Sequence, residues 1–428
     1  MALASSSIRG TRLGSPAMSI APPVPVLVRC PSLAAQPCST SQSTQQLSWA
    51  ALPRSRQHRL AASTSESAST VVTASELDVG YSSAQGVRDT MEDEVQVHYN
   101  TLGQYLYAAV FDGHGGDWSA QWLAKQLHVQ VESCLVGKTL YGKANGNGAN
   151  GASNGASGST TINGGRGISS RDICPEQLIE SFHLADRELL SHLSASGGEE
   201  AAQSGSTATV VVIKDDKLVV ANVGDSQAVL SRKGVAVPLA HYHRVYGTGP
   251  DVTAEIERIK AVGGWIDDGR VCGVLAVSRA FGDWEFKGEG LPRLLETGIE
   301  RGFWDASFAS QQRFSSDPVL ATPDVTETTL SEDDEFLIVA SDGLWDVLPP
   351  REAVQWARKE FKAKKDAAQV AASLTGLALK RYSTDNVAVV VVDLQGQDFW
   401  RGKPKGKAAG PAPAKKAGGM FGGLFRSG

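Results

Sequence analysis

Acidic residues and lysine are absent from the first 65 residues of this 428-residue chain, which instead carry six arginines, seven prolines and many serines. The first acid is Glu66. This composition is typical of an organellar transit peptide, and it favours the chloroplast over the mitochondrion because no arginine-studded amphipathic helix begins the chain. The alternative is an unstructured, low-complexity N-terminus. We therefore expect residues 1–65 to be a chloroplast transit peptide.

Long apolar runs and paired cysteines are also missing. The longest apolar runs, such as 387–392, are only as long as a strand, so no segment is expected to span a bilayer.

Five cysteines lack CxxC or paired spacing, which indicates neither a disulfide framework nor a zinc site. A cysteine nucleophile acting on phosphate esters needs a phosphate-binding arginine six residues later, whereas Arg279 follows Cys272 by seven. We interpret Cys272 as a small residue in a strand.

Basic residues are scarce in the middle of the chain. Residues 66–400 hold 28 basic and 46 acidic side chains, a net charge near −18, which excludes nucleic acid as a partner. The segment from Arg401 onward reverses this balance, with seven basic residues, no acid, and a terminal MFGGLF. We expect 401–428 to be a flexible basic tail that can contact an anionic membrane peripherally but cannot span it.

A shift in composition interrupts the folded unit. Residues 142–167 are almost entirely Gly, Asn, Ala and Ser, which cannot bury apolar surface, so we expect a disordered insertion. The remaining folded unit is then 77–400. Nothing in it predicts an oligomer, and a monomer is expected.

The folded unit contains strand and helix patterns in separate blocks. Runs rich in β-branched residues at 207–213, 217–223 and 227–231 predict an antiparallel meander. Further strands are predicted at 105–111, 335–340 and 387–392, and helices at 118–131, 176–193, 252–262, 353–362 and 367–381. This arrangement predicts an α+β fold.

Aspartates recur where the predicted strands end. Asp112 follows the strand 105–111, Asp342 follows 335–340, and Asp385 precedes 387–392. Each Asp could belong to an ordinary turn, but several together can converge on one point. Glycine at 113 permits a tight turn that exposes a backbone carbonyl beside the Asp112 carboxylate. Ligands made only of oxygen favour Mg²⁺ or Mn²⁺ over zinc.

Seven stretches occur in the order found in the PPM/PP2C family of metal-dependent protein serine/threonine phosphatases, which this chain resembles across nearly the whole folded unit. They are RDTMED at 88–93, FDGHGG at 111–116, GSTA at 205–208, ANVGDS at 221–226, LAVSRAFGD at 275–283, ASDGLWD at 340–346 and DN at 385–386. The resemblance implies a four-layer αββα sandwich of two antiparallel sheets flanked by helices. It also implies hydrolysis of phosphoserine and phosphothreonine in protein substrates by a hydroxide held between two metal ions, Mg²⁺ or Mn²⁺.

The same resemblance implies a set of metal ligands. Asp112 would bridge the two ions, and Asp342 with Asp385 would hold one of them. The other ion would be completed by Glu92 and the Gly113 carbonyl. Further residues assigned by resemblance are Asp93 for metal-bound waters, and Asp225 and Asp346 for a weaker third metal.

Two side chains would act on the substrate. Arg88 offers a planar fork for two phosphate oxygens, the alternative being a surface ion pair. His114 resembles the residue proposed as general acid toward the leaving Ser or Thr oxygen, and its imidazole suits that task. A merely structural histidine is the alternative.

Within the family, three stretches resemble a plastid branch that acts on light-harvesting complex II at the thylakoid during state transitions: HYHRVYG at 241–247, RIKAVGGWI at 258–266, and FW at 303–304 before ATPD at 321–324. The basic tail departs from the apolar anchor expected of that branch. The alternatives are a catalytically inactive relative that binds phosphoproteins, and a phosphatase of another organellar target. The intact aspartates favour the active enzyme.

Overall fold

The computed structural model describes residues 74, 77–141, 173–196 and 201–402. The expected transit peptide, the insertion at 142–167 and the tail beyond residue 402 lie outside the described residues.

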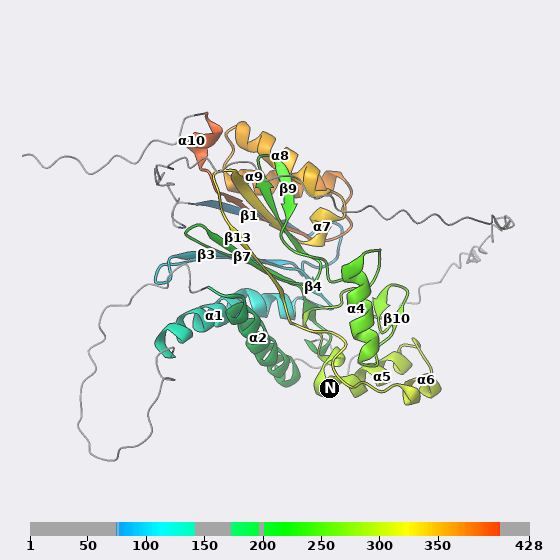
Figure 1. Cartoon of the computed structure of the whole chain (residues 1–428). Coiled ribbons are helices and arrows are strands. Elements are labelled where there is room, and N and C mark those ends of the chain that lie inside the picture. Colours follow the sequence, from blue (N-terminus) through cyan, green and yellow to red (C-terminus); the bar gives the residue numbers. More distant parts are fainter. Residues whose placement is uncertain (1–73, 75–76, 142–172, 197–200, 403–428) are drawn as a thin grey trace, which may run out of the picture. The chain divides into compact units, whose positions relative to one another are not determined.

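Two five-stranded antiparallel sheets form the centre of the fold (Figure 1). The β14 sheet has the order β1 (Asp78–Ala84), β15 (Val387–Asp393), β14 (Asp334–Ala340), β8 (Gln227–Arg232), β9 (Val235–Pro238). The β3 sheet has the order β13 (Asp324–Thr329), β7 (Lys217–Val223), β6 (Ala208–Lys214), β3 (Tyr105–Phe111), β2 (Glu94–Asn100).

Strand β3 shows why these runs are apolar at every position. Its side chains alternate between two cores, because successive residues of a strand point to opposite faces. Leu106 and Val110 lie in the core between the sheets together with Val339 of β14, whereas Tyr107 and Phe111 lie in the core beneath the helices. A strand buried on both faces therefore needs no polar alternation.

Two pairs of helices cover the outer faces of the sheets (Figure 1). Helices α1 (Trp118–Tyr141) and α2 (Pro175–Ser196) pack on the β3 sheet. Helices α8 (Pro350–Lys362) and α9 (Ala367–Lys380) pack on the β14 sheet, and α9 begins with a capping box formed by Asp366 and Gln369. The four layers match the αββα sandwich implied by the resemblance.

A small lobe with its own apolar cluster joins the sandwich. It contains α4 (Pro250–Ala261), β10 (Ile266–Asp267), β11 (Arg270–Val271), α5 (Leu291–Glu300) and α6 (Ala306–Gln311). Trp265 and Trp304 meet edge to face there, with ring centroids 5.3 Å apart. The remaining short elements are β4 (Gly113–His114), β5 (Gly205–Ser206), β12 (Phe281–Gly282), the 3₁₀ turns η3 (Trp284–Phe286) and η4 (Gly288–Gly290), α7 (Asp342–Trp345) and α10 (Gln397–Trp400).

The prediction of a three-stranded meander is wrong in one respect. Strands β6 and β7 form the expected hairpin, but β8 belongs to the other sheet, where it pairs with β14 and β9. The chain changes sheets at Gly224, whose φ of 95° favours glycine. A side chain at this position would also meet Thr207, whose Cγ2 would lie 2.4 Å from an added Cβ.

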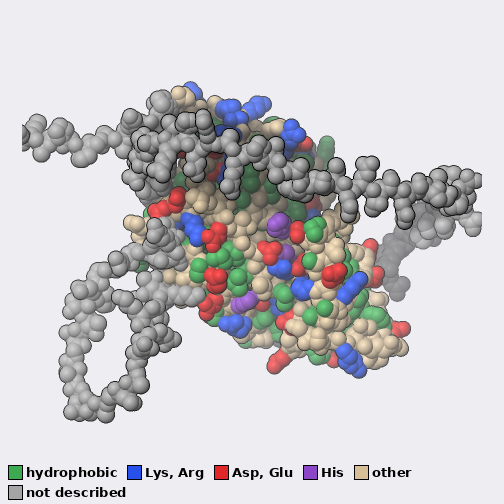
Figure 2. Space-filling model, in the orientation of Figure 1, with side chains coloured by type: hydrophobic (Ala, Val, Ile, Leu, Met, Phe, Trp, Pro, Cys, Tyr) green, Lys and Arg blue, Asp and Glu red, His purple; other side chains and the backbone are tan. Residues whose placement is uncertain are grey.

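Charged side chains of both signs are interspersed over the face in Figure 2. Among the residues that the structure describes, no helix is both long enough and apolar enough to cross a bilayer.

Candidate metal centre

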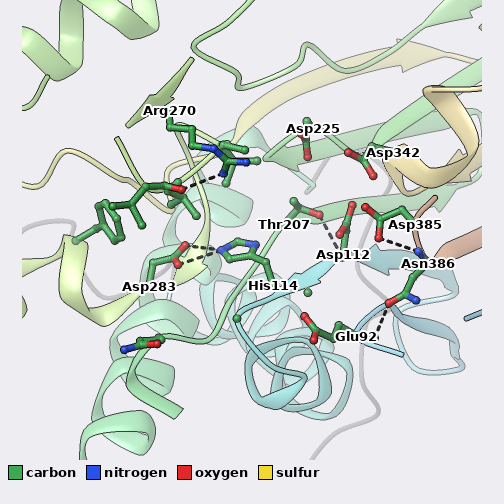
Figure 3. Close-up of a pocket in the computed structure, with 18 of the residues that line it drawn as sticks. Glu92, Asp112, His114, Thr207, Asp225, Arg270, Asp283, Asp342, Asp385 and Asn386 are labelled. Atoms are coloured by element: carbon green, nitrogen blue, oxygen red, sulfur yellow. Dashed lines mark hydrogen bonds and ion pairs between the residues drawn. The ribbon is translucent and has the colours of Figure 1, made fainter. Parts of the chain in front are cut away.

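Three carboxylates from the two sheets meet at one point. Asp112 follows β3, Asp225 lies between β7 and β8, and Asp342 begins α7, which Ser341 alone separates from the end of β14. One carboxylate oxygen from each lies within 4.8 Å of the others (Figure 3). Two of the three strand-end aspartates of the prediction, Asp112 and Asp342, therefore converge. The third member of the cluster is not Asp385 but Asp225, which the resemblance had assigned to a weaker third metal.

Two of these carboxylates, Asp112 and Asp342, are placed where negative charge is unfavourable. Burial, and then repulsion from Asp93, Asp342 and Asp225, raises the pKa of Asp112 well above its ordinary value. Burial and the charges of Asp225 and Asp346 raise the pKa of Asp342 to about 8. Such a cluster is stable in its charged form only beside cations. Because every donor is an oxygen, the residues fit a hard divalent ion such as Mg²⁺ or Mn²⁺.

Asp385 lies beside this cluster and already has two partners. One of its oxygens accepts a hydrogen bond from the Asn386 amide at 2.8 Å, and the other forms an ion pair with Arg88 Nη2 at 2.6 Å. Arg88 Nε also donates to the Thr384 carbonyl at 3.2 Å. The ion pair weighed as the alternative for Arg88 is thus present, but its partner is one of the predicted metal ligands.

Glu92 and Gly113 lie close to each other and line the same cavity as Asp112. Glu92 accepts hydrogen bonds from Thr90 Oγ1 at 2.8 Å and from the Gly116 amide at 3.4 Å. A Cβ at position 113 would approach the Glu92 carbonyl oxygen to 2.4 Å. Only glycine therefore allows these two segments to lie so close together.

Asp93 is 4% exposed, and its charge acts on Asp112. Burial raises its pKa to about 7, opposed by a hydrogen bond of 2.7 Å that Ser341 Oγ donates to it. The same Ser341 oxygen accepts from the Ala388 amide. Asp93 is thus tied to the ends of β14 and β15, consistent with a supporting place behind the ligands.

His114 pairs with an acid that the sequence analysis left without a role. Its Nε2 lies 3.0 Å from both carboxylate oxygens of Asp283. Burial alone would lower the pKa of His114, but the charge and hydrogen bonds of Asp283 raise it above its ordinary value. A Cβ at Gly205 would lie 2.2 Å from His114 Nε2 and 2.4 Å from Asp283 Oδ2, so glycine leaves room for the pair.

A cavity of about 450 Å³ opens over these residues. The sandwich contributes the acids, Arg88 and His114, and the lobe contributes apolar side chains such as Val274 and Leu275. Two further cations of the lobe region, Arg270 and Arg301, also line it. The cavity has the size of a small-ligand site and can admit a phosphorylated side chain with its neighbours.

Asp346 lies apart from the three converging carboxylates. Its side chain is 60% exposed, and its closest charged partner is the Arg244 guanidinium at 3.5 Å. Arg244 also contacts Asp225 and Asp342.

Cys272 does not lie in a strand but in a turn after β11, with a φ of 50°. Burial raises its pKa to about 12, so its thiol stays protonated at neutral pH and is no nucleophile.

The roles of Asp283 and Arg244 were not predicted from the sequence. Both residues belong to stretches that carry the family resemblance, and the acid that ends LAVSRAFGD was the usable signal for Asp283. Nothing in the sequence placed the Arg244 guanidinium among the acids, since that contact depends on the crossover between the sheets.

The fold and the site together define a metal-dependent phosphatase. The family model for Protein phosphatase 2C matches residues 77–387. Protein phosphatase 2C 57 of Arabidopsis thaliana is 37% identical over 352 residues, covering 82% of this chain and 84% of that protein. Probable protein phosphatase 2C 27 of Arabidopsis thaliana is 33% identical over 325 residues, covering 73% and 68%. The chain belongs to the protein phosphatase 2C family and is a metal-dependent protein serine/threonine phosphatase.

Solved structures agree in fold. The serine-threonine phosphatase 2C from Toxoplasma gondii has a TM-score of 0.55 at 17% identity, covering 76% of this chain and 96% of that one. A C. elegans sex determining protein has a TM-score of 0.53 at 22% identity, covering 76% and 67%. At these identities the likeness concerns the fold alone.

Proposed function

We propose that the site binds two divalent cations, Mg²⁺ or Mn²⁺, with Asp112 shared between them. Glu92 and the Gly113 carbonyl would complete one site, and Asp342 and Asp385 the other. The observation that carries this proposal is the approach of the Asp112 and Asp342 carboxylates, one oxygen of each lying within 4.8 Å of the other. When bound, the cations supply the charge that makes a water acidic enough to attack phosphorus near neutral pH.

Arg88 would bind the phosphate. Its side chain is 57% exposed at the cavity, and one edge is held by Asp385 and the Thr384 carbonyl. A guanidinium anchored on one edge can present its remaining N–H groups to two phosphate oxygens. This contact would orient the phosphorus and offset the charge of the phosphate.

His114 would donate the proton that the leaving serine or threonine oxygen needs. Its Nε2 is held by Asp283, which favours the protonated ring and leaves Nδ1 as the donor toward substrate. Asp283 acts through His114 and is therefore a positioning residue. Asp93 would accept hydrogen bonds from waters around the cations.

The metal assignment is tested by phosphate release from a phosphothreonine peptide with Mn²⁺, with Mg²⁺, and with a chelator. We expect turnover with either ion and none with chelator. Asp112→Asn should abolish turnover, whereas Asp215→Asn, an exposed carboxylate in the β6–β7 hairpin, should not. Equal turnover by Asp112→Asn and wild type would reject the assignment and favour a different set of ligands.

We also propose that the enzyme acts in the chloroplast, in the stroma or on the stromal face of the thylakoid, on phosphorylated light-harvesting complex II. The acid-free leader supports the compartment, and the stretches 241–247 and 258–266 support the plastid branch. The test is quantitative phosphoproteomics of thylakoids with and without the protein. Phosphothreonine on the antenna proteins should accumulate in its absence. Accumulation on another organellar phosphoprotein instead would identify that protein as the target.

A further inference from the structure

Arg244 is a largely buried cation beside the three converging carboxylates, and the proposed chemistry gives it no task. Its Nε donates to Asp225 Oδ2 at 2.7 Å, and its Nη2 donates to Asp342 Oδ2 at 3.1 Å. The same Nη2 lies 3.5 Å from Asp346 Oδ1. A single guanidinium thus contacts three aspartates, two of which belong to the converging carboxylates.

The backbone holds this guanidinium in place. The His243 amide donates to the Gly224 carbonyl at 3.0 Å, and the Gly224 amide donates to His243 Nδ1 at 3.1 Å. On the other side the Ser278 amide donates to the His243 carbonyl at 2.9 Å, and Arg244 bridges to Val277. The segment that carries Arg244 is therefore fixed to the loop that carries Asp225.

Two tyrosine rings complete the surroundings. The Arg244 Cζ lies 5.1 Å from the ring centroids of both Tyr242 and Tyr246, a distance at which a cation is attracted to an aromatic face. The Arg244 side chain is 13% exposed. Burial alone would lower its pKa, but Asp225 raises it above its ordinary value, so the charge is permanent.

Asp225 and Asp346 are the residues that the family resemblance associates with a third metal. In this chain the space between them holds the Arg244 guanidinium, which satisfies Asp225 through a charge-assisted hydrogen bond. A divalent ion could enter only if it displaced this buried, ring-stacked cation and left it without its carboxylate partners. The residues therefore do not fit a third ion.

We infer that Arg244 is a resident cation that takes the place of a third metal ion and holds Asp225 and Asp342 in position. This inference rests on the proposed two-metal function. Its consequence is that metal loading at the site ends with two ions, while the third positive charge belongs to the chain and cannot be removed by a chelator.

The test is the number of Mn²⁺ ions bound by the full-length protein, measured by titration with detection of free Mn²⁺ by electron paramagnetic resonance up to millimolar concentration. We expect wild type to bind two ions. Arg244→Ala should bind one ion more, and Arg244→Ala/Asp346→Asn should lose that extra ion. Arg244→Lys, which keeps the charge, should bind the same number as wild type.

Asp346→Asn in the wild-type background provides a second measurement that does not require Arg244→Ala to fold, because Asp346 is exposed. We expect it to bind as many ions as wild type. The inference is overturned if wild type binds an ion that Asp346→Asn removes, or if folded Arg244→Ala binds no more ions than wild type. The total bound by wild type tests the two-metal function separately, since the inference depends on the difference between variants.

Discussion

Removal of metal should make the stability of this phosphatase fall as the pH rises. Burial and neighbouring acids raise the pKa of Asp342 to about 8, from an ordinary value of 3.8. A carboxyl whose pKa is higher in the folded than in the unfolded chain keeps its proton longer in the folded state. Between these two values the folded protein binds more protons, so raising the pH favours unfolding.

The magnitude follows from one retained proton. Each proton bound in excess by the folded state changes the free energy of unfolding by about 1.4 kcal/mol per pH unit. Between pH 5.5 and 7.0, Asp342 alone should therefore lower the stability of the metal-free protein by about 2 kcal/mol. Saturating Mn²⁺ should reverse this trend, because the ion binds only the deprotonated carboxylates.

The assay is urea unfolding, followed by tryptophan fluorescence, of wild type and Asp342→Asn in a chelator across this pH range. Asparagine does not titrate, so the difference between the two proteins reports Asp342 together with Asp112, whose pKa the Asp342 charge helps to raise. The same difference cancels the histidines, including His114, whose raised pKa also makes stability fall with pH. From pH 5.5 to 7.0, we expect the free energy of unfolding of Asp342→Asn to rise by about 2 kcal/mol relative to that of wild type. Parallel pH profiles of the two proteins would refute the reasoning.

Further outcomes are expected for the site and the two ends of the chain. Asp342→Asn should lower turnover of a phosphopeptide in saturating Mn²⁺ by at least ~10²-fold with the fold retained, because water activation supplies several kcal/mol; near-normal turnover would remove the two-metal mechanism. Asp283→Asn should lower the pKa of His114 and so move the alkaline limb of the pH–rate profile to lower pH. It should slow hydrolysis of a phosphoserine peptide more than hydrolysis of p-nitrophenyl phosphate, because the leaving group of p-nitrophenyl phosphate needs no acid. Equal slowing of both substrates would exclude the general-acid role. Residues 1–60 fused to a fluorescent protein should enter chloroplasts, and cytosolic fluorescence would contradict the compartment. Truncation after Trp400 should leave turnover of a soluble peptide unchanged but abolish co-sedimentation with anionic liposomes at low salt; equal sedimentation would leave the tail without a docking role.

The α+β class and two acids of the cluster could be predicted from local signals in the sequence, whereas the four-layer arrangement was implied by the family resemblance. The apolar run of β3 ends at Asp112, and the run of β14 ends at Asp342, so the strand ends locate both carboxylates. Helices α1, α2, α4, α8 and α9 were predicted from their periodicity, although α1 continues to Tyr141, ten residues beyond the predicted end. Helices α5 and α6 of the lobe were not predicted.

What could not be predicted depends on contacts between distant segments. A β-branched run such as β8 has the same pattern in either sheet. Its place in the β14 sheet depends on the turn at Gly224 and on its pairing with β14 and β9. The crossover places Asp225 beside Asp112, and the segment returning at Arg244 then places a cation there. Spacing along the chain contains neither fact.

The acids at the site come from different sheets: Asp112 extends from the β3 sheet, and Asp342 and Asp385 from the β14 sheet. Cations bound between these acids would link the two sheets of the sandwich. The distances between the ligands would then depend on the thickness of the layer between the sheets. A change in side-chain volume at a position such as Ala108 or Val390, far from any substrate, would therefore change the metal affinity. The tight packing of that layer therefore helps to set the geometry of the metal ligands.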